Sequence, residues 1–266
     1  MAHVAITGAD GNVGSAAVEA FDHETHKVTP MTHSETEGME SVVVDVSDRE
    51  QFVEKLPEDA DVLVHLAANP SPYAEWDEVK EVNVDGAFNA YYAADENDVG
   101  RVVYASSNHA TNGHIVADPD EPETMRADAD VIDPDDETAP DSFYGVTKVA
   151  GEAMGNYFAH REGVETVNLR IGWLLSEQDL KDEVTDPVSE EYAEEAARFA
   201  RAMWLSPSDC KDAVRAASLA DLPDGENSVT VNAISANDER CLSLTHGLRT
   251  IGYRPRDNAA EVIESN

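Results

Sequence analysis

A glycine-rich turn between an expected strand and an expected helix constrains the fold more than any other segment of the chain. The strand is the β-branched, apolar run Val4–Thr7, the turn is Gly8–Gly14, and the helix is Ser15–Ala20. Three glycines in such a turn let the backbone come close to a pyrophosphate, whose charge is met by amides at the helix N-terminus. The segment therefore predicts the first strand, turn and helix of a dinucleotide-binding fold.

Strand and helix patterns alternate beyond this unit. Strands are expected at Ser41–Val46, Val62–Leu66, Arg101–Ser106, Val164–Arg170 and Val229–Ile234, and helices at Val79–Asp95, Tyr144–His160 and Glu190–Trp204. Such alternation predicts an α/β protein with a Rossmann-type doubly wound parallel sheet, covered by helices on both faces. We expect a dinucleotide-binding core over residues 1–170 and a small C-terminal substrate-binding region, interleaved with the core, over residues 171–266.

The charge of the chain limits its partners. It has 55 Asp and Glu against 18 Lys and Arg, a net charge of −37. Ten acidic residues lie in the insertion 115–140 and nine in the stretch 176–195, which we expect to be solvated surface loops. Without a basic stripe, neither nucleic acid nor an anionic membrane is expected as a partner. Carboxylates at this density repel one another unless salt shortens the Debye length, to about 3 Å at molar strength, so we expect a salt-rich cytoplasm.

Cysteine, histidine and apolar patterns exclude further classes of protein. Cys210 and Cys241 are too few for a disulfide framework, which favours a reducing compartment. The nine histidines are scattered without metal-ligand spacing, so no metal site is expected. No run of 18 apolar residues occurs, and the start of the chain does not resemble a leader segment, so neither membrane spanning nor secretion is expected.

The segment after the first helix indicates which dinucleotide is bound. In dinucleotide-binding folds, an acidic residue at the end of the second strand binds the adenosine ribose and repels a 2′-phosphate. Thr32, His33 and Ser34 stand at that place here, and each can donate a hydrogen bond to a phosphate. We therefore favour NADP over NAD, although no arginine supports this preference and a register that places Glu35 at the strand end would reverse it.

Tyr144 and Lys148 form the second constellation that carries chemistry. Four residues apart in an expected helix, they project from one face, where the ammonium can stabilise a phenolate and hold the nicotinamide ribose. An expected strand ends at Tyr104–Ser107, and Ser107 can hydrogen-bond the substrate oxygen that Tyr144 deprotonates. The three residues predict an acid–base unit for hydride transfer.

The chain resembles the extended short-chain dehydrogenase/reductase family, and within it the uronate dehydrogenases and the related halophilic sugar and sugar-phosphate dehydrogenases. The glycine turn and the Tyr/Lys pair are typical of the whole superfamily, whereas the segments 106–110 and 251–258 are typical of the subgroup. The matching segments span nearly the whole chain: Gly8–Gly14, His65–Ala68, Asn83–Gly86, Ser106–Ala110, Tyr144–Lys148, Arg170–Gly172, Ser235–Asp238 and Ile251–Asn258.

The resemblance implies NAD- or NADP-dependent oxidation of a cyclic aldose at its anomeric carbon, giving an aldonolactone. It makes Tyr144 the general base, Lys148 the partner that lowers its pKa and binds ribose, and Ser107 the group that polarises the hydroxyl. Asp45 is expected to accept a hydrogen bond from the adenine amine, a role in the turn being the alternative. The expected cofactor contacts are Gly8, Asp10, Gly11, Asn12, Val13, Gly14, Thr32, His33, Ser34, Asp45, Val46, Leu66, Ala67, Ala68, Asn83, Tyr144, Lys148 and Ile171, and the expected substrate contacts are Ser71, Ser107, Asn108, His109, Tyr144, Trp173, Arg198 and Arg201.

Departures from the uronate dehydrogenase pattern leave the charge of the sugar open. Trp173 replaces a small polar residue, and the arginine that clamps a substrate carboxylate is either Arg198 or Arg201. An ion pair with Glu194 or Glu195 is the alternative role for these arginines, and the sugar is then a neutral aldose. The same helix carries an apolar stripe that is expected to be core: Tyr192, Ala196, Phe199 and Met203.

Two other functions remain as alternatives. Nucleotide-sugar epimerases and dehydratases share both motifs but carry a larger C-terminal region, whereas 96 residues follow Arg170 here (266 − 170). A cofactor-sensing regulator without catalysis is the second alternative, against which the Ser/Tyr/Lys set argues. The resemblance also implies a homodimer, formed through the helix Tyr144–His160.

Overall fold

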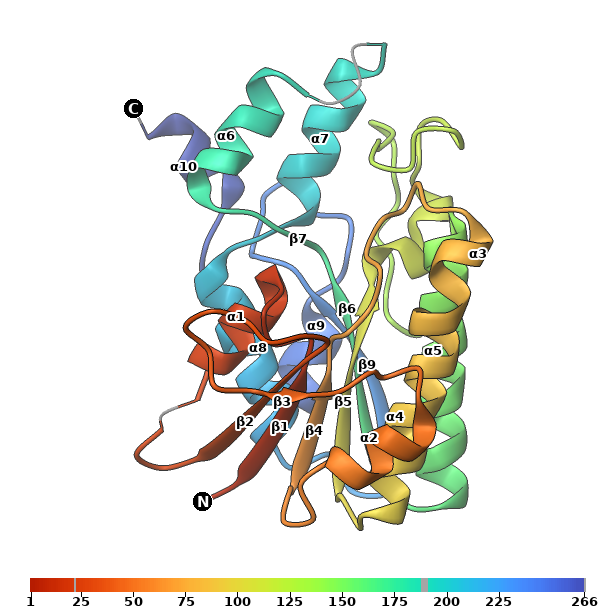
Figure 1. The fold of residues 1–266 in the computed structure, drawn as a ribbon. Coiled ribbons are helices and arrows are strands. Elements are labelled where there is room, and N and C mark those ends of the chain that lie inside the picture. Colours follow the sequence, from red (N-terminus) through yellow and green to blue (C-terminus); the bar gives the residue numbers. More distant parts are fainter. Residues whose placement is uncertain (22, 188–190, 266) are drawn as a thin grey trace.

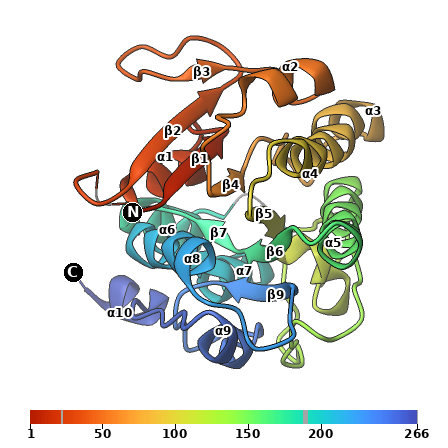
Figure 2. The same ribbon diagram turned by 90° about the horizontal axis from the view of Figure 1, so that it is seen from below.

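The computed structural model describes residues 1–21, 23–187 and 191–265. In this part of the chain, seven parallel strands form one sheet with the order β3-β2-β1-β4-β5-β6-β9 (Figures 1 and 2). The strands are β1 (His3–Thr7), β2 (Lys27–Thr32), β3 (Val42–Val43), β4 (Val62–His65), β5 (Arg101–Ser107), β6 (Glu165–Ile171) and β9 (Ser228–Ala233). The predicted doubly wound parallel sheet is confirmed.

The strand order reverses between β1 and β4. The chain first moves outward from β1 to β3, then returns to pair β4 with the other edge of β1, with Thr7 opposite both Met31 and His65. Crossover connections on the two sides of this point leave a crevice beyond the carboxyl ends of the strands. The order of the strands therefore places a ligand site beside the glycine turn.

Helices cover both faces of the sheet (Figures 1 and 2). One face carries α1 (Asn12–Glu19) and α8 (Pro207–Leu219), and the other carries α2 (Arg49–Lys55), α4 (Gly86–Glu96) and α5 (Phe143–Arg161). Because strand side chains alternate between the faces and helices cover both faces, apolar strand residues are buried on both sides of the sheet, with polar residues such as Asn168 and Arg170 buried among them. Two core clusters result, one on each side of the sheet.

The segment predicted as one helix, Val79–Asp95, belongs to a run of three consecutive elements that starts earlier, at Trp76. They are α3 (Trp76–Val79), a π-helical turn at Lys80–Asp85, and α4. A π-helical turn inserts an extra residue into the helical ladder and so changes the direction of the side chains that follow. Periodicity alone did not separate these elements, because the apolar spacing continues through all three.

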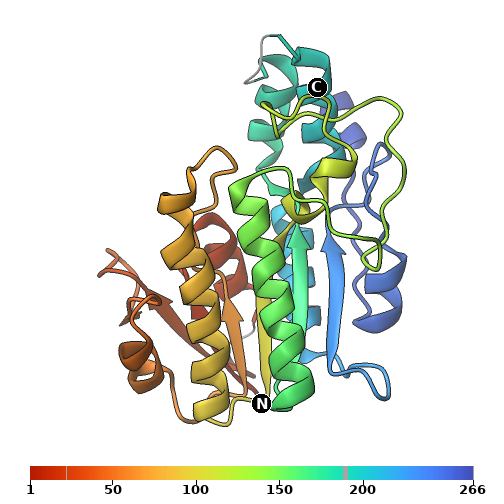
Figure 3. The same cartoon turned by 90° about the vertical axis from the view of Figure 1, so that its right-hand side faces the viewer.

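Further elements lie beyond the carboxyl ends of the strands (Figures 1 and 3). A short two-stranded pair of β7 (Trp173–Leu174) and β8 (Trp204–Leu205) joins α6 (Glu177–Thr185) and α7 (Ala193–Met203) to the core. Helices α6 and α7 pack with α10 (Ala259–Glu264) around the buried ring of Trp204. The remaining elements are α9 (Thr245–Thr250) beside β9 and two 3₁₀ turns, Asn108–Ala110 and Asn112–His114.

The two acidic stretches are not simply solvated loops. In the stretch 176–195, the expectation of a loop is wrong for α6, which begins where the Ser176 side chain accepts a hydrogen bond from the Asp179 amide and which buries Leu180. Glu190, at the expected start of the following helix, lies outside the described residues. The insertion 115–140 has little regular structure but buries Ile115, Met125 and Ile132 against α7. The insertion and α6 therefore both pack on α7.

The described helices include none that is long and apolar enough to cross a bilayer. Within the same residues, His, Cys, Asp and Glu side chains form no group of three that could hold a metal ion. Cys210 and Cys241 are both buried free thiols.

A buried ion pair joins α5 to the sheet. Glu152 accepts hydrogen bonds from Nε and Nη2 of Arg170, both at 2.9 Å, and from the Ser106 hydroxyl at 2.5 Å. The side chains of Glu152 and Arg170 are 7% and 3% exposed. Arg170 also donates from Nη1 to the carbonyl of Pro134 at 3.2 Å. One carboxylate and one guanidinium thus connect α5, β5, β6 and the insertion.

We expect Glu152→Ala to lower the free energy of unfolding by about 3–5 kcal/mol, because it leaves the Arg170 charge buried without its partner. The measurement is urea denaturation in molar KCl. The matched control is Glu162→Ala at the exposed end of the same helix, where a change within about 0.5 kcal/mol is expected. Equal effects of the two substitutions would contradict the stabilising role of the buried pair.

Candidate active site

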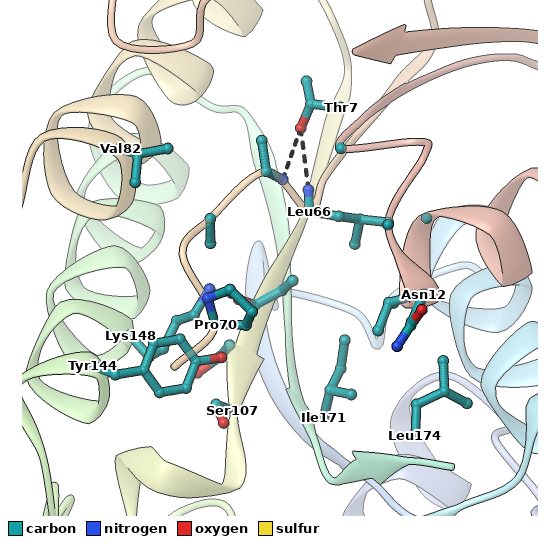
Figure 4. Close-up of a pocket in the computed structure, with 18 of the residues that line it drawn as sticks. Thr7, Asn12, Leu66, Pro70, Val82, Ser107, Tyr144, Lys148, Ile171 and Leu174 are labelled. Atoms are coloured by element: carbon teal, nitrogen blue, oxygen red, sulfur yellow. Dashed lines mark hydrogen bonds between the residues drawn. The ribbon is translucent and has the colours of Figure 1, made fainter. Parts of the chain in front are cut away.

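A cavity of about 870 Å³ lies beyond the carboxyl ends of β1, β4 and β5 (Figure 4). One end is formed by the glycine turn and the start of α1, where Asn12 lies, and the other by Ser107, Tyr144 and Lys148. Thr7 lies at the strand switch point above them. The cavity therefore occupies the crevice that the strand order predicts.

The glycine turn is shaped by the close approach of backbone to backbone. A Cβ atom on Gly14 would lie 2.0 Å from the carbonyl oxygen of Gly8, and one on Gly8 would lie 2.9 Å from the amide of Ala67. Gly8 also has a φ of +63°, which side chains disfavour. Gly11, at the N-cap of α1, supplies no side chain to the first amides of the helix, and residues 11–14 line the cavity, an arrangement that suits an anion.

The hydroxyl of Thr7 joins the ends of β1 and β4. It accepts hydrogen bonds from the amides of Leu66 at 3.1 Å and Ala67 at 3.3 Å (Figure 4). It also donates to Nδ1 of His65 at 2.9 Å. Burial lowers the pKa of His65 to about 3, and the charge of Lys148 acts in the same direction. His65 is therefore a neutral acceptor, and the wall formed by residues 66–68 is held against the glycine turn.

The far side of the turn is lined by the ends of β2 and β3. Thr32 and His33 line the cavity, but the Thr32 hydroxyl already donates to the Ser34 carbonyl at 2.8 Å and contacts the Ser41 hydroxyl at 2.7 Å. Ser34 is not among the residues that line the cavity. Of the three predicted phosphate donors, His33 is the one that is both exposed and part of the cavity wall.

Two carboxylates accompany His33 in this part of the cavity. Asp45 follows β3, which ends at Val43 and so is shorter than predicted, and it lines the cavity together with Val46. The hydroxyl and amide of Ser47 lower the pKa of the Asp45 carboxyl, with a smaller effect from the charge of His33. On the glycine turn, Asp10 accepts a hydrogen bond from the Thr36 hydroxyl at 3.2 Å.

Tyr144 and Lys148 lie on one face of α5, opposite the end of β5. The Lys148 Nζ donates to the carbonyl of Ala105 at 2.7 Å and lies 5.3 Å from the centre of the Tyr144 ring. Burial raises the pKa of Tyr144 to about 12, although its hydrogen bond with Ser107 acts in the opposite direction. Burial lowers the pKa of Lys148 to about 7. The arrangement brings the phenol of Tyr144 and the amine of Lys148 together at this end of the cavity.

Asn83 supports this arrangement from behind the residues that line the cavity. It lies in the π-helical turn, where its side chain accepts from the amide of Asn69 at 2.8 Å and donates to the carbonyl of the same residue at 3.0 Å. Its amide also lies 3.1 Å from the hydroxyl of Thr147 on α5. Asn83 therefore positions the loop after β4 against α5, and it is not among the residues that line the cavity.

Residues that follow β5 and the insertion surround the end of the cavity beyond Tyr144. His109 packs edge-on against the Tyr144 ring, with ring centres 5.7 Å apart, and its Nδ1 lies 2.8 Å from the carboxylate of the buried Asp141. Asn108 accepts from the Ser107 hydroxyl at 3.2 Å. Trp173 also lines this end. Besides the residues already described, the predicted residues that the structure places in the cavity wall are Gly8, Asp10, Gly11, Asn12, Val13, Gly14, Leu66, Ala67, Ala68, Asn108, His109, Ile171 and Trp173.

Three predicted substrate contacts lie elsewhere. Arg198 donates to Glu194 at 2.9 Å and to the Met125 carbonyl at 3.0 Å, so the predicted alternative of an intrahelical ion pair is what the structure shows. Arg201 pairs with Glu239 at 2.9 Å. Ser71 lies outside the described lining, to which its neighbours Pro70 and Pro72 contribute. The charges on the face of α7 that carries these arginines are therefore already paired within the protein.

Several residues of this end were not singled out from the sequence. Glu123 of the acidic insertion and Phe199 of α7 line the cavity, and Asp141 holds His109. Phe199 belonged to an apolar stripe whose periodicity is the same for core and cavity positions. Glu123 is one of ten carboxylates in a stretch without periodicity, so no local signal distinguishes it.

The burial of Lys148 predicts a pH-dependent stability. The unfolded chain keeps the proton of this lysine up to its ordinary pKa of 10.5, whereas the folded chain releases it near 7. Between these values the unfolded state binds more protons, so the free energy of unfolding rises with pH. We expect Lys148→Met to reduce this rise by up to about 1.4 kcal/mol per pH unit, measured by urea denaturation at a series of pH values.

The matched control is Lys27→Met, at an exposed lysine whose charge water screens. Its stability profile is expected to run parallel to that of the wild type. A Lys148→Met profile that also runs parallel to the wild type would show that the lysine keeps its proton when buried.

Comparison with known proteins agrees with this geometry. The sequence profile described as "NAD dependent epimerase/dehydratase family" matches residues 4–203. The chain is 53% identical, over 99% of its length and 100% of the relative, to L-arabinose 1-dehydrogenase (NAD(P)(+)) of Haloferax volcanii. It is 32% identical to NAD-dependent glucose-6-phosphate dehydrogenase of the same organism, over 97% of this chain and 94% of the relative. Among solved structures, glucuronic acid dehydrogenase from Chromohalobacter salexigens is similar with a TM-score of 0.75 and 26% identity, over 100% of this chain and 90% of that chain.

Proposed function

Since the chain belongs to the NAD dependent epimerase/dehydratase family, we propose that it is an NAD(P)-dependent sugar 1-dehydrogenase, which oxidises a cyclic aldose at the anomeric carbon to an aldonolactone. The observation that carries the proposal is the meeting of Ser107, Tyr144 and Lys148 at one end of a cavity whose other end is the glycine turn. The 53% identical relative, named for the same reaction on arabinose, supports it.

The residues present fit a dinucleotide. Gly8 and Gly14 leave space where a Cβ atom would fill the turn, and the uncapped amides of α1 face that space. In this proposal the pyrophosphate lies on the glycine turn, the adenosine near His33 and Asp45, and the nicotinamide ribose near Lys148. When bound, the oxidised nicotinamide supplies the hydride acceptor and a positive charge beside the phenol.

In this proposal the side chains of the protein remove the proton of the anomeric hydroxyl. The hydroxyl of Ser107 orients the anomeric hydroxyl, and Tyr144 as phenolate takes its proton as the C1–H bond breaks and the C1 carbonyl forms. The Lys148 ammonium, close to the Tyr144 ring, favours the phenolate over the phenol. This opposes the effect of burial, which holds the pKa of Tyr144 high in the protein alone.

The finer assignments belong to the same proposal. Residues 1–170 hold the dinucleotide, while residues 171–266 and the insertion 115–140 form the sugar side of the cavity. NADP is preferred over NAD, because neither Thr32 nor His33 is acidic and the His33 side chain can meet a phosphate. The enzyme works in a salt-rich cytoplasm, where salt screens a net charge of −37.

The activity is tested in molar KCl by following the absorbance of reduced nicotinamide. NAD and NADP are each offered with neutral aldoses, uronates, sugar 6-phosphates and nucleotide sugars. We expect turnover with one of the first three classes, and we expect Tyr144→Phe to lower kcat/KM by about 10²–10⁴-fold, because the general base is lost. The control is Tyr157→Phe, at an exposed tyrosine of the same helix, with unchanged turnover expected.

Full activity of Tyr144→Phe would contradict the proposed mechanism. Consumption of a nucleotide sugar without net cofactor reduction, with no turnover of the other three classes, would instead identify an epimerase.

We also propose a homodimer, formed through α4 and α5. These helices lie side by side on one outer face (Figure 3), where Phe88 is 37% and Tyr157 57% exposed. Both rings contact Phe158, with centres 6.1 Å and 5.5 Å away. Exposed aromatic rings that extend a buried cluster are typical of protein interfaces.

Light scattering in molar KCl is expected to give twice the chain mass of 28.8 kDa. Tyr157→Glu is expected to shift the protein toward the monomer, because it places a charge in an apolar interface. The control is Leu248→Glu on α9, which is 43% exposed and lies away from this face. A monomeric mass for the wild type would exclude the dimer.

A further inference from the structure

The insertion 115–140 contributes one carboxylate to the sugar side of the cavity. Glu123 lines the cavity and is only partly exposed. The hydroxyl of Tyr73 donates to its Oε2 at 3.1 Å. Tyr73 lies in the segment that follows β4, so two segments 50 residues apart in the chain meet at this carboxylate and hold it in place.

The surroundings of Glu123 are negative. Burial raises the pKa of the Glu123 carboxyl, the charges of Asp141 and Glu121 act in the same direction, and the charge of His109 and the hydrogen bond from Tyr73 act against them. Nδ1 of His109 lies 2.8 Å from the buried carboxylate of Asp141, so a further carboxylate stands directly beside this ring. The cavity wall carries further carboxylates on the side of α3: Asp77, Glu78 and Glu81.

Basic side chains are scarce at the sugar side, where Asp77 pairs with Lys80, a residue that does not line the cavity. Along the wall that the structure describes, Lys148 is the only lysine or arginine, and its Nζ donates to the carbonyl of Ala105. Arg198 and Arg201 are paired with Glu194 and Glu239 outside the lining. A carboxylate or phosphate on the sugar would therefore meet Glu123 without a cation to bind it, whereas sugar hydroxyls are donors that suit a carboxylate.

We propose that Glu123 is the specificity-determining residue of the sugar site: its carboxylate accepts hydrogen bonds from ring hydroxyls of a neutral aldose and repels a sugar that carries a carboxylate or a phosphate. The proposal rests on the proposed function. The charge of His109 acts on the Glu123 carboxyl, and the His109 ring also contacts the ring of Tyr144. Glu123 therefore lies near the end of the cavity where the proposed reaction takes place. Tyr73 is the positioning residue that orients the carboxylate.

The test compares two sugars whose rings carry the same hydroxyl pattern, L-arabinose and D-galacturonate, which differ in the carboxylate at C5. In the wild type, kcat/KM is expected to favour the neutral sugar. Glu123→Gln is expected to lower kcat/KM for arabinose by about tenfold, because a charged acceptor is lost, and to raise it for galacturonate. The preference, expressed as the ratio of the two kcat/KM values, is therefore expected to fall by more than about tenfold.

The ratio separates recognition from folding. A variant that is merely less stable loses activity toward both sugars alike and keeps the wild-type ratio. The matched control is Glu121→Gln, which makes the same charge change two residues away, outside the described lining, and is expected to leave the ratio within about twofold. Tyr73→Phe is expected to raise KM for arabinose while kcat stays the same, because it frees the carboxylate without touching the reacting atoms.

Each outcome decides the proposal. An unchanged ratio in Glu123→Gln, with an active wild type, overturns the role of Glu123 and leaves the proposed function standing. A wild type that prefers galacturonate overturns it as well. A wild type that oxidises no sugar with either cofactor overturns the proposed function, and the role of Glu123 with it.

Discussion

The buried pair of Glu152 and Arg170 is the interaction on which the rest of the site depends. Two charges with little access to water are stable only when every donor and acceptor is matched, and here the carboxylate is matched by the guanidinium and by Ser106. Glu152 follows Lys148 by one turn of α5, and Lys148 follows Tyr144 by one turn, so the three share a helix face. Fixing Glu152 against β5 and β6 therefore sets the register of Tyr144 and Lys148 against Ser107, which adjoins Ser106 on β5.

The two ends of the cavity are built by different physical means. At the dinucleotide end, the shape comes from the backbone: Gly8 and Gly14 approach each other more closely than any side chain permits, and the Thr7 hydroxyl fastens the neighbouring strand end. At the sugar end, the shape comes from side chains of segments far apart in the chain. The first end suits a ligand common to a whole family, and the second can vary with the substrate without disturbing the sheet.

One of the many carboxylates of the chain lies in the wall of the cavity, at its sugar end. Most of the chain's carboxylates form a solvated surface, but the insertion 115–140 also buries apolar side chains and binds Arg170 through the Pro134 carbonyl. This anchoring is what brings one of its carboxylates, Glu123, into the cavity wall. A segment that resembles a halophilic surface loop in composition therefore contributes to the proposed recognition of the sugar.

Local patterns in the sequence were enough for the parallel sheet, the glycine turn and the Tyr144/Lys148 pair, because strand and helix periods and a four-residue spacing are properties of the chain over a few residues. The helix α6, the π-helical turn and the short β3 departed from expectation where capping and packing outweighed periodicity. Only the tertiary structure decided three other features of the site. These are the direction of Arg198 and Arg201, the place of Asn83 and the presence of Glu123 in the cavity. Each depends on which distant partner packs against it, such as Glu239, Thr147 or Tyr73, and no short stretch of sequence contains both members of such a pair.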